Sequence, residues 1–442
     1  MAKCASDLNH YKSILGTHSK AAAISRVAIV VVVIVVIVIA GVAGYVLTRP
    51  SASVKVPAYI NIGSVLSITG PSSTGQSDMQ WALNYWVNQT NSQGGIFMSA
   101  YNKKIPVKLT ILDDASDNGN DPQLYNELVN TYNVSAIVQG SNDGSLFVEL
   151  PVVERLGVPF VTAFSFYNST WSLYQGVDPA PKWAYFVWYN TYYDSTIWFN
   201  WMNSLNSSIK PISVAAVSAS ITGFGLTAGL FLSTAAQNGY KVALPLQTYD
   251  VASTDLSSLV LKLKAANPDV VFAMSFDPDG ILLIKQANQL GFHPKLWIMP
   301  ITGGDPGLYG TLGSEANGVM TDGEWQWTSN TPGTAQIVAA YKSQVATATN
   351  PCCDTAIAYA SGPMQALLNA IGRAGTINRT AIANALQTTD MTGMVGHVQF
   401  NSGHDSYTVI PAIYQWQNGD ITTVYPLANA TAKVIYPIPG SG

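Results

Sequence analysis

The segment 58–113 starts with AYINIGSVL at 58–66, continues with SDMQWALNYWVNQTNSQ at 77–93 and closes with VKLTILD at 107–113. Apolar residues crowd the first stretch and alternate with polar ones in the third, as they do in β-strands. In the second stretch they recur every three or four positions, which predicts a helix that Gly94-Gly95 ends. A strand, a helix and a strand in this order predict parallel strands in one sheet.

The same alternation continues along the chain. Further strands are expected at 136–139, 158–162, 184–188, 212–217, 242–249, 270–273 and 295–299. Helices between them are expected at 122–132, 146–156, 226–237, 256–266 and 280–290, and Asp194 can cap another that runs through residue 206. After Gly318 the pattern predicts a strand, helices around 333–348, 354–373 and 378–387, and terminal strands.

This order predicts an α/β protein whose parallel sheets are covered by helices on both faces. The pattern restarts near 180–190, so we expect two Rossmann-like lobes joined by a hinge. The first lobe is assigned residues 58–185 with about 320–395, and the second is assigned 186–319 with about 396–432. A Ser/Pro-rich linker at 48–57 precedes both lobes.

Composition narrows the kinds of function. Of the 442 residues 48% are hydrophobic and 10% are charged, against about 25% charged in an ordinary soluble protein. A chain this apolar is not disordered as a whole, and a net charge of −4 without a basic block argues against nucleic-acid binding. The low charge also suits acidic surroundings, because few carboxylates lose stabilising interactions as the pH falls.

Residues 27–47 (VAIVVVVIVVIVIAGVAGYVL) form an apolar run long enough to cross a bilayer as one helix. Four basic side chains and a single aspartate precede it, so the positive-inside rule places residues 1–26 in the cytoplasm. We therefore expect a single-pass protein of the cell membrane with an extracellular main domain. Six Asn-x-Ser/Thr triplets after the run fit a glycosylated exterior, at Asn88, Asn133, Asn168, Asn206, Asn378 and Asn429.

Catalytic and cofactor motifs do not emerge from the chain. A glycine-rich stretch at 223–229 follows a strand, but its third glycine is one residue late for a dinucleotide loop. Asp113 and Asp114 are adjacent in a strand and point to opposite faces, so they are not a carboxylate pair. Cys352 and Cys353 could form a vicinal disulfide, although we favour two unreactive helix residues. We expect no enzyme, no cofactor and no metal site.

Loops rich in small and polar residues follow several expected strands. Open parallel sheets bind ligands at the carboxyl ends of their strands, where these loops lie. The loops occur at 140–145 (GSNDGS) and 162–167 (TAFSFY) in the first lobe, and at 220–224 (SITGF) and 275–279 (SFDPD) in the second. Small residues there let backbone N–H groups and hydroxyls face an anion. Loops of this kind on both lobes favour a ligand cleft between them.

These residues also carry a family resemblance, which spans about 58–432. The matching stretches are 62–71 (IGSVLSITGP), 91–96 (NSQGGI), 112–114 (LDD), 135–140 (SAIVQG), 151–159 (PVVERLGVP), 267–271 (NPDVV), 287–292 (ANQLGF) and 370–376 (AIGRAGT). In this order and spacing they resemble the solute-binding proteins of branched-chain amino-acid ABC importers, which have the type I periplasmic-binding-protein fold. The stretch at 19–22 (SKAA) further resembles the type IV pilin-like signal of many archaeal binding proteins. The resemblance implies cleavage between Lys20 and Ala21.

The resemblance implies a set of ligand-binding residues. On the first lobe, the family's carboxylate-binding positions match Ser141, Ser145, Ala163 and Ser165, and a further contact falls near Thr74. Hinge contacts fall near Trp188 and Tyr193. On the second lobe, Phe224 matches a ligand-facing aromatic residue, and Asp277, with Asp279 in reserve, would pair with an ammonium group. Trp188 stands where relatives often have arginine, so an aromatic amino acid, an amide or a short peptide is as compatible as an aliphatic amino acid.

The resemblance implies a protein that captures a small solute outside the cell and delivers it to an ABC permease. Two other functions remain open for the same fold. One is a receptor ectodomain that senses its ligand without transport. The other is a structural protein that assembles into a surface array through its apolar N-terminus.

Overall fold

The computed structural model describes residues 31, 34, 35, 37, 55–73, 75–139, 145–164, 181–187, 191–251, 253–345, 353, 355–438 and 441. The chain divides into two compact units, Met1–Val56 and Pro57–Gly442, and the elements below belong to the second unit. Within the described part of the chain, no helix is both long and apolar enough to cross a membrane. The transmembrane helix expected at 27–47 lies outside the described residues, apart from 31, 34, 35 and 37.

The first sheet is parallel throughout, with the strand order β4-β1-β5-β6-β7. Its strands are β1 (Ile60–Leu66), β4 (Val107–Asp113), β5 (Ala136–Val138), β6 (Phe160–Thr162) and β7 (Ala184–Phe186). Side chains of a strand alternate between the two faces of its sheet. Along β1, Ile60 and Ile62 therefore join one apolar cluster and Val65 joins another.

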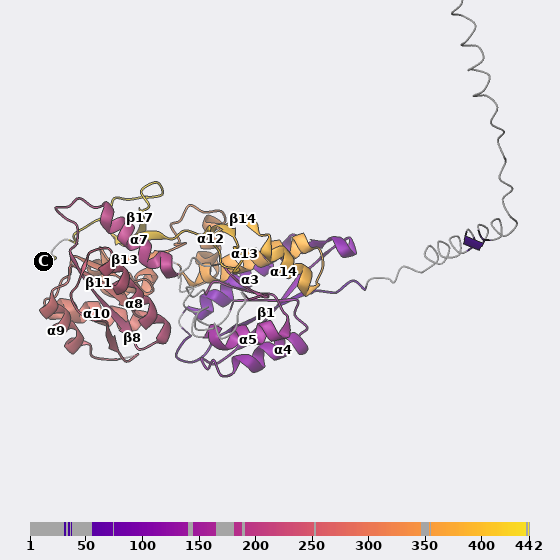
Figure 1. The fold of residues 1–442 in the computed structure, drawn as a ribbon, viewed down its shortest axis with the longest axis horizontal. Coiled ribbons are helices and arrows are strands. Elements are labelled where there is room, and N and C mark those ends of the chain that lie inside the picture. Colours follow the sequence, from indigo (N-terminus) through magenta and orange to yellow (C-terminus); the bar gives the residue numbers. More distant parts are fainter. Residues whose placement is uncertain are drawn as a thin grey trace, which may run out of the picture. The chain divides into compact units, whose positions relative to one another are not determined.

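Helices cover both faces of this sheet, as the sequence predicts. They are α3 (Gln76–Ser92), α4 (Asp121–Asn130), α5 (Leu146–Leu156), α13 (Ala356–Ala374) and α14 (Arg379–Gln387). Helices α4 and α5 share an apolar cluster with Val65 on one face, and α3 and α13 share the other cluster with Ile62. Figure 1 shows α13, from late in the chain, beside α3 from its beginning.

The second sheet has the strand order β10-β8-β11-β12-β13-β16-β17, and β9 also pairs with β8. Its strands are β8 (Ser213–Ala219), β9 (Lys241–Val242), β10 (Gln247–Tyr249), β11 (Val270–Met274), β12 (Leu296–Ile298), β13 (Met320–Gly323), β16 (Ala412–Gln417) and β17 (Asp420–Tyr425). Strands β8 to β13 are parallel, whereas β16 and β17 are antiparallel.

The remaining elements surround the second sheet and complete the first. Along the second sheet's part of the chain lie α7 (Thr191–Ser204), α8 (Thr222–Gln237), α9 (Ser257–Ala266), α10 (Asp277–Gln289) and α11 (Pro306–Leu312), with the short helices η3 (Thr302–Gly304) and η4 (Gly313–Ala316). Near the first sheet lie η1 (Ser99–Tyr101), α12 (Thr334–Gln344) and the hairpins β2 (Ile96–Met98) with β3 (Lys103–Ile105) and β14 (Asp390–Gly393) with β15 (Gly396–Gln399).

The chain passes three times between the parts that carry the two sheets. It leaves after β7, returns between β13 and α12, and leaves again between β15 and β16. Helix α12 belongs with α3, because the Tyr341 hydroxyl donates to Asp78 (2.8 Å) and its ring packs edge-on against Trp81. Residues 320–323, which the sequence analysis gave to the first lobe, instead form β13 of the second sheet, since β13 pairs with β12 and β16.

Several predicted elements differ in their bounds. The strand expected at 242–249 is two strands, β9 and β10, because Pro245 between them has no N–H to donate to a ladder. Helix α7 begins at Thr191, so Asp194 lies within it and is not its cap. The expectation of two unreactive helix cysteines is wrong for Cys353, which precedes α13 and is disulfide-bonded; Cys352 lies outside the described residues.

One carboxylate fixes the start of β7, the strand that leads to the first passage. The Oε1 atom of Glu154 accepts the N–H groups of Trp183 (2.7 Å) and Ala184 (3.2 Å), and its Oε2 accepts that of Lys182 (3.0 Å). Three backbone donors thus depend on one side chain from α5.

We expect Glu154→Ala to lower the free energy of unfolding by about 2–3 kcal/mol, because part-buried N–H groups lose a charged acceptor. Urea unfolding of the full chain measures this difference. Glu127→Ala on neighbouring α4 is the control, since the Glu127 carboxylate makes no hydrogen bond to a described residue. Equal losses in the two variants would show that Glu154 does not hold β7 in place.

Candidate ligand-binding site

On the first sheet, the carboxyl ends of β5 and β6 are joined by hydrogen bonds. Gln139 directly follows β5 and is fully buried, and its Oε1 accepts the N–H of Ala163 (3.0 Å) directly after β6. Ser145 is buried where α5 starts, and its Oγ donates to Oε1 of Glu149 (2.7 Å). Ala163 and Ser145 therefore lie at neighbouring strand ends, and each already has a protein partner.

Most of the other predicted ligand-binding residues of the first lobe and the hinge lie outside the described residues. Thr74, Ser141, Ser165 and Trp188 lie outside the described residues. Tyr193 belongs to α7, but only its backbone is described. The contribution of these five residues to a site stays a prediction from the family resemblance.

On the second sheet, adjacent strands β8 and β11 bring an aromatic pair and a carboxylate together. The rings of Phe224, from α8, and Phe276, before α10, have centroids 5.0 Å apart and are tilted by 57°. Asp277 is half-buried and begins α10, next to Phe276. Phe224 and Asp277 lie in the first turns of helices and not in loops, because both helices start earlier than expected; Pro278 favours the earlier start of α10.

Asp279 has a different environment from Asp277. Its side chain is only 3% exposed, and burial together with the charge of Asp279 raises the pKa of the Tyr249 hydroxyl. Asp279 therefore lies near Tyr249 in the interior of this part of the protein. Asp277, which is more exposed, is the better placed of the two to meet a cation from solution.

Two buried side chains that were not predicted from the sequence lie where the chain leaves β13. Glu324 is 7% exposed and Gln326 is 0% exposed, and within the described structure neither side chain has a hydrogen-bond partner. Burial, together with the charge of Asp322, raises the pKa of the Glu324 carboxyl. A ligand that bonds to these atoms would remove the free-energy cost of leaving them unpaired. The only sequence signal is the stretch GEWQW at 323–327, where polar and tryptophan side chains alternate directly after a strand.

Three buried carboxyl groups lie close together beside the start of α5. They belong to Asp114, Asp121 and Glu149, all of which have 0% exposure. Burial and the nearby charges of Glu149 and Asp114 raise the pKa of Asp121 to about 9. Asp121 is therefore protonated at neutral pH. Burial also raises the pKa of the Asp405 carboxyl, to about 6, and a hydrogen bond with Asn401 partly opposes this rise.

Because the folded state raises the pKa of Asp121 above its ordinary value of 3.8, this group stabilises the fold fully below about pH 4 and loses that contribution as the pH rises towards 9. We expect the melting temperature of the full chain to fall across this window, and to fall less in Asp121→Asn, which cannot ionise. Asp255→Asn is the control, because hydrogen bonds lower the pKa of this exposed group and its effect belongs at acid pH. Parallel pH profiles for wild type and Asp121→Asn would refute the assignment.

The groups at the strand ends are suited to binding a small molecule. Among the described residues, no group of three or more His, Cys, Asp or Glu side chains could hold a metal ion. Asp113 accepts hydrogen bonds from Ile68, Thr69 and Ala115 and fixes the loop after β1. Polar and aromatic side chains at the carboxyl ends of adjacent parallel strands are typical of α/β proteins that bind small molecules.

Comparison with known proteins identifies the family. The sequence profile described as periplasmic binding protein matches residues 59–420, and the chain belongs to this family. A Leu/Ile/Val-binding protein homolog (homolog 7) from Brucella abortus (strain 2308) is 24% identical over 411 residues, which cover 89% of this chain and 98% of the relative. The resemblance to branched-chain amino-acid solute-binding proteins is thus confirmed.

Solved structures confirm the type I fold. The branched-chain amino acid transporter substrate binding protein from Streptococcus pneumoniae, in complex with isoleucine, has a TM-score of 0.68 at 16% identity and covers 86% of this chain and 100% of its own. A solute binding protein of an ABC transporter from R. palustris, in complex with benzoate, has a TM-score of 0.69 at 12% identity and covers 85% and 97%.

Proposed function

We propose that this chain is an extracellular solute-binding protein that captures an amino acid or a related small polar solute between two lobes and delivers it to an ABC importer. The observation that carries the proposal is the matched placement of polar and aromatic side chains at strand ends of both sheets. Ser145 follows β5, and Phe224 and Asp277 follow β8 and β11. The protein binds and releases its ligand and carries out no reaction on it.

The three chain passages supply the hinge for this function. Few covalent connections join the two sheets, so small backbone rotations in the passages can close the lobes over a ligand. A ligand that contacts both lobes stabilises the closed form, because it binds that form better than the open one. The closed form then docks on the permease.

The apolar run at 27–47 tethers the protein to the cell membrane, with residues 1–26 inside and the binding domain outside. The exposed positions of four described sequon asparagines support glycosylation outside the cell: Asn88, Asn206, Asn378 and Asn429. Tethering keeps the binding domain near its permease. Without a tether, the protein would diffuse away from the cell.

The ligand carries an anionic group that the first lobe binds, and Asp277 decides whether it also carries a cation. Isoleucine and benzoate, bound by the two structural neighbours, share a carboxylate, but only isoleucine has an ammonium group. An acidic side chain beside an aromatic pair favours a ligand with both an ammonium group and an apolar portion. An amino acid or a short peptide meets this description, whereas a neutral amide lacks both charged groups.

A thermal-shift panel on the purified full-length chain tests the proposed function. It includes aliphatic and aromatic amino acids, amides, short peptides, benzoate and sugars, at acidic and neutral pH. We expect a selective rise in melting temperature with amino-acid-like ligands, because a ligand that binds only the folded state stabilises it. The absence of any shift across the panel would argue against capture of such solutes and favour the surface-array alternative.

Asp277→Ala tests the cation-binding role within this site. We expect it to weaken the best amino-acid ligand of the panel by about tenfold or more, because the ammonium group loses a charged partner. Asp277→Asn is the matched variant, since it keeps the shape of the side chain and one acceptor oxygen but not its charge. Calorimetric titration measures both. Unchanged affinity in the alanine variant would remove Asp277 from the site while leaving the function itself standing.

A further inference from the structure

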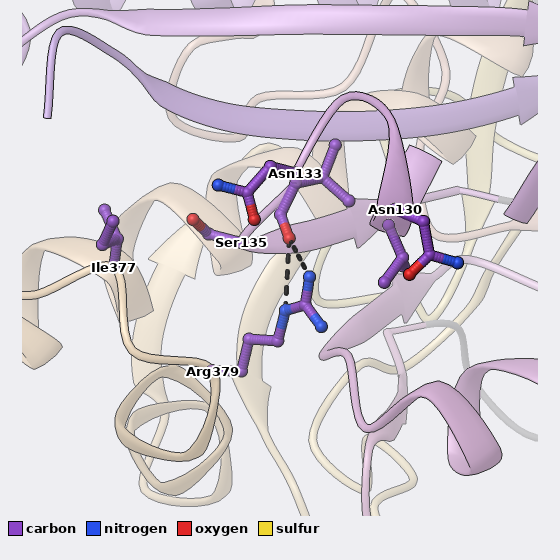
Figure 2. Close-up of a pocket in the computed structure, with 7 residues that line it drawn as sticks. Asn130, Asn133, Ser135, Ile377 and Arg379 are labelled. Atoms are coloured by element: carbon purple, nitrogen blue, oxygen red, sulfur yellow. Dashed lines mark hydrogen bonds between the residues drawn. The ribbon is translucent and has the colours of Figure 1, made fainter. Parts of the chain in front are cut away.

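A hollow lies at the amino end of β5, on the side of the first sheet opposite to the candidate site. It has a volume of about 420 Å³, and the described residues that line it are Val129, Asn130, Asn133, Val134, Ser135, Ile377 and Arg379. They come from the end of α4, the turn before β5 and the start of α14, which Figure 2 shows around one space. This is the amino end of β5, whereas Ser145 follows its carboxyl end, so the hollow is separate from the proposed ligand cleft.

Arg379 brings an unneutralised positive charge to the hollow. Its Nε and Nη2 both donate to the carbonyl oxygen of Val134 (3.2 and 2.7 Å), as the dashed lines in Figure 2 show. No other bond to a described residue engages the guanidinium, which leaves the N–H groups of Nη1 for another acceptor. None of the described residues that line the hollow is acidic.

Arg373, on neighbouring α13, offers a comparison, because all three nitrogens of its guanidinium donate hydrogen bonds within the protein. Arg373, near the end of α13, donates through Nε to Asn369 and through Nη1 to Thr388. Its Nη2 donates to Ala385 and Thr389. The donors of Arg373 are consumed by the protein, whereas those of Arg379 are only half used. Arg379 is therefore more than a structural clamp between α14 and the turn before β5.

Ser135 adds a neutral donor to the hollow. The residue as a whole is only 6% exposed, and its hydroxyl lines the hollow and makes no hydrogen bond to a described residue. The hydroxyl is therefore available to donate to an acceptor that enters the hollow. The side-chain amides of Asn130 and Asn133 stand at the same hollow and can also donate.

We propose that this hollow binds a small oxyanion, such as a carboxylate, sulfate or phosphate, independently of the transported solute. Arg379 supplies the charge and two N–H groups in one plane, the geometry that suits an oxyanion. Ser135 and the asparagine amides supply neutral donors. Burial disfavours the charged guanidinium and lowers the pKa of Arg379, and an anion in the hollow would offset that effect.

Calorimetric titration of the full-length chain with sulfate, at constant ionic strength, tests the proposal. Wild type should bind sulfate saturably. Arg379→Gln should weaken this binding by about tenfold or more, and Ser135→Ala by about threefold, because they remove a charged and a neutral donor respectively. Ser135→Ala leaves the bonds between Arg379 and Val134 in place, so it remains informative if Arg379→Gln fails to fold.

Lys103→Gln is the matched control. It removes one exposed positive charge near the first sheet, and Lys103 does not line the hollow. It should bind sulfate as wild type does. Anomalous density from crystals soaked in selenate should locate the anion within hydrogen-bonding distance of Arg379 and Ser135. Non-saturable binding to wild type, equal weakening by Lys103→Gln and Arg379→Gln, or selenate density elsewhere only, would each overturn the proposal.

Discussion

The fold depends on burying both faces of a parallel sheet. Strand β1 places Ile62 in one apolar cluster and Val65 in the other, so helices must cover both sides. The segment that follows β1 supplies α3 for one face, but α3 alone does not close it. The chain therefore returns from the second sheet to add α13 beside α3 (Figure 1). Each return requires a passage between the sheets, and these passages form the hinge of the proposed mechanism.

The same constraint places the functional groups. All strands of the first sheet run in one direction, so the residues that follow them meet at one edge. There Gln139 holds the backbone after β6 through Ala163, and on the second sheet α10 begins with Asp277 next to an aromatic pair. At the opposite ends of the strands, the end of α4, the turn before β5 and the start of α14 meet, and there Arg379 and Ser135 line a hollow. The two edges thus serve different chemistry.

The chain has few charged residues, and several of its carboxyl groups lie in the interior of the protein. Several of the few carboxyl groups are buried without a cation, and burial favours their protonated forms, as for Asp121 and Glu324. Such groups destabilise a fold in alkaline solution and are tolerated in acid. This agrees with the expectation of acidic surroundings that the low content of charged residues suggests.

The succession of strands and helices follows from the amino-acid sequence alone, because apolar periodicity and the placement of Gly and Pro are local properties. Helix α5 falls at the residues that periodicity indicates, and the family motifs are likewise contiguous stretches. Packing in three dimensions determines that 320–323 joins the second sheet, that Gln326 is buried without a partner among the described residues and that Cys353 is disulfide-bonded. It also decided that Arg379 reaches the carbonyl of Val134, 245 positions earlier. Periodicity shows which face of an element is apolar, but the partner that covers that face is chosen by packing between segments distant in the chain.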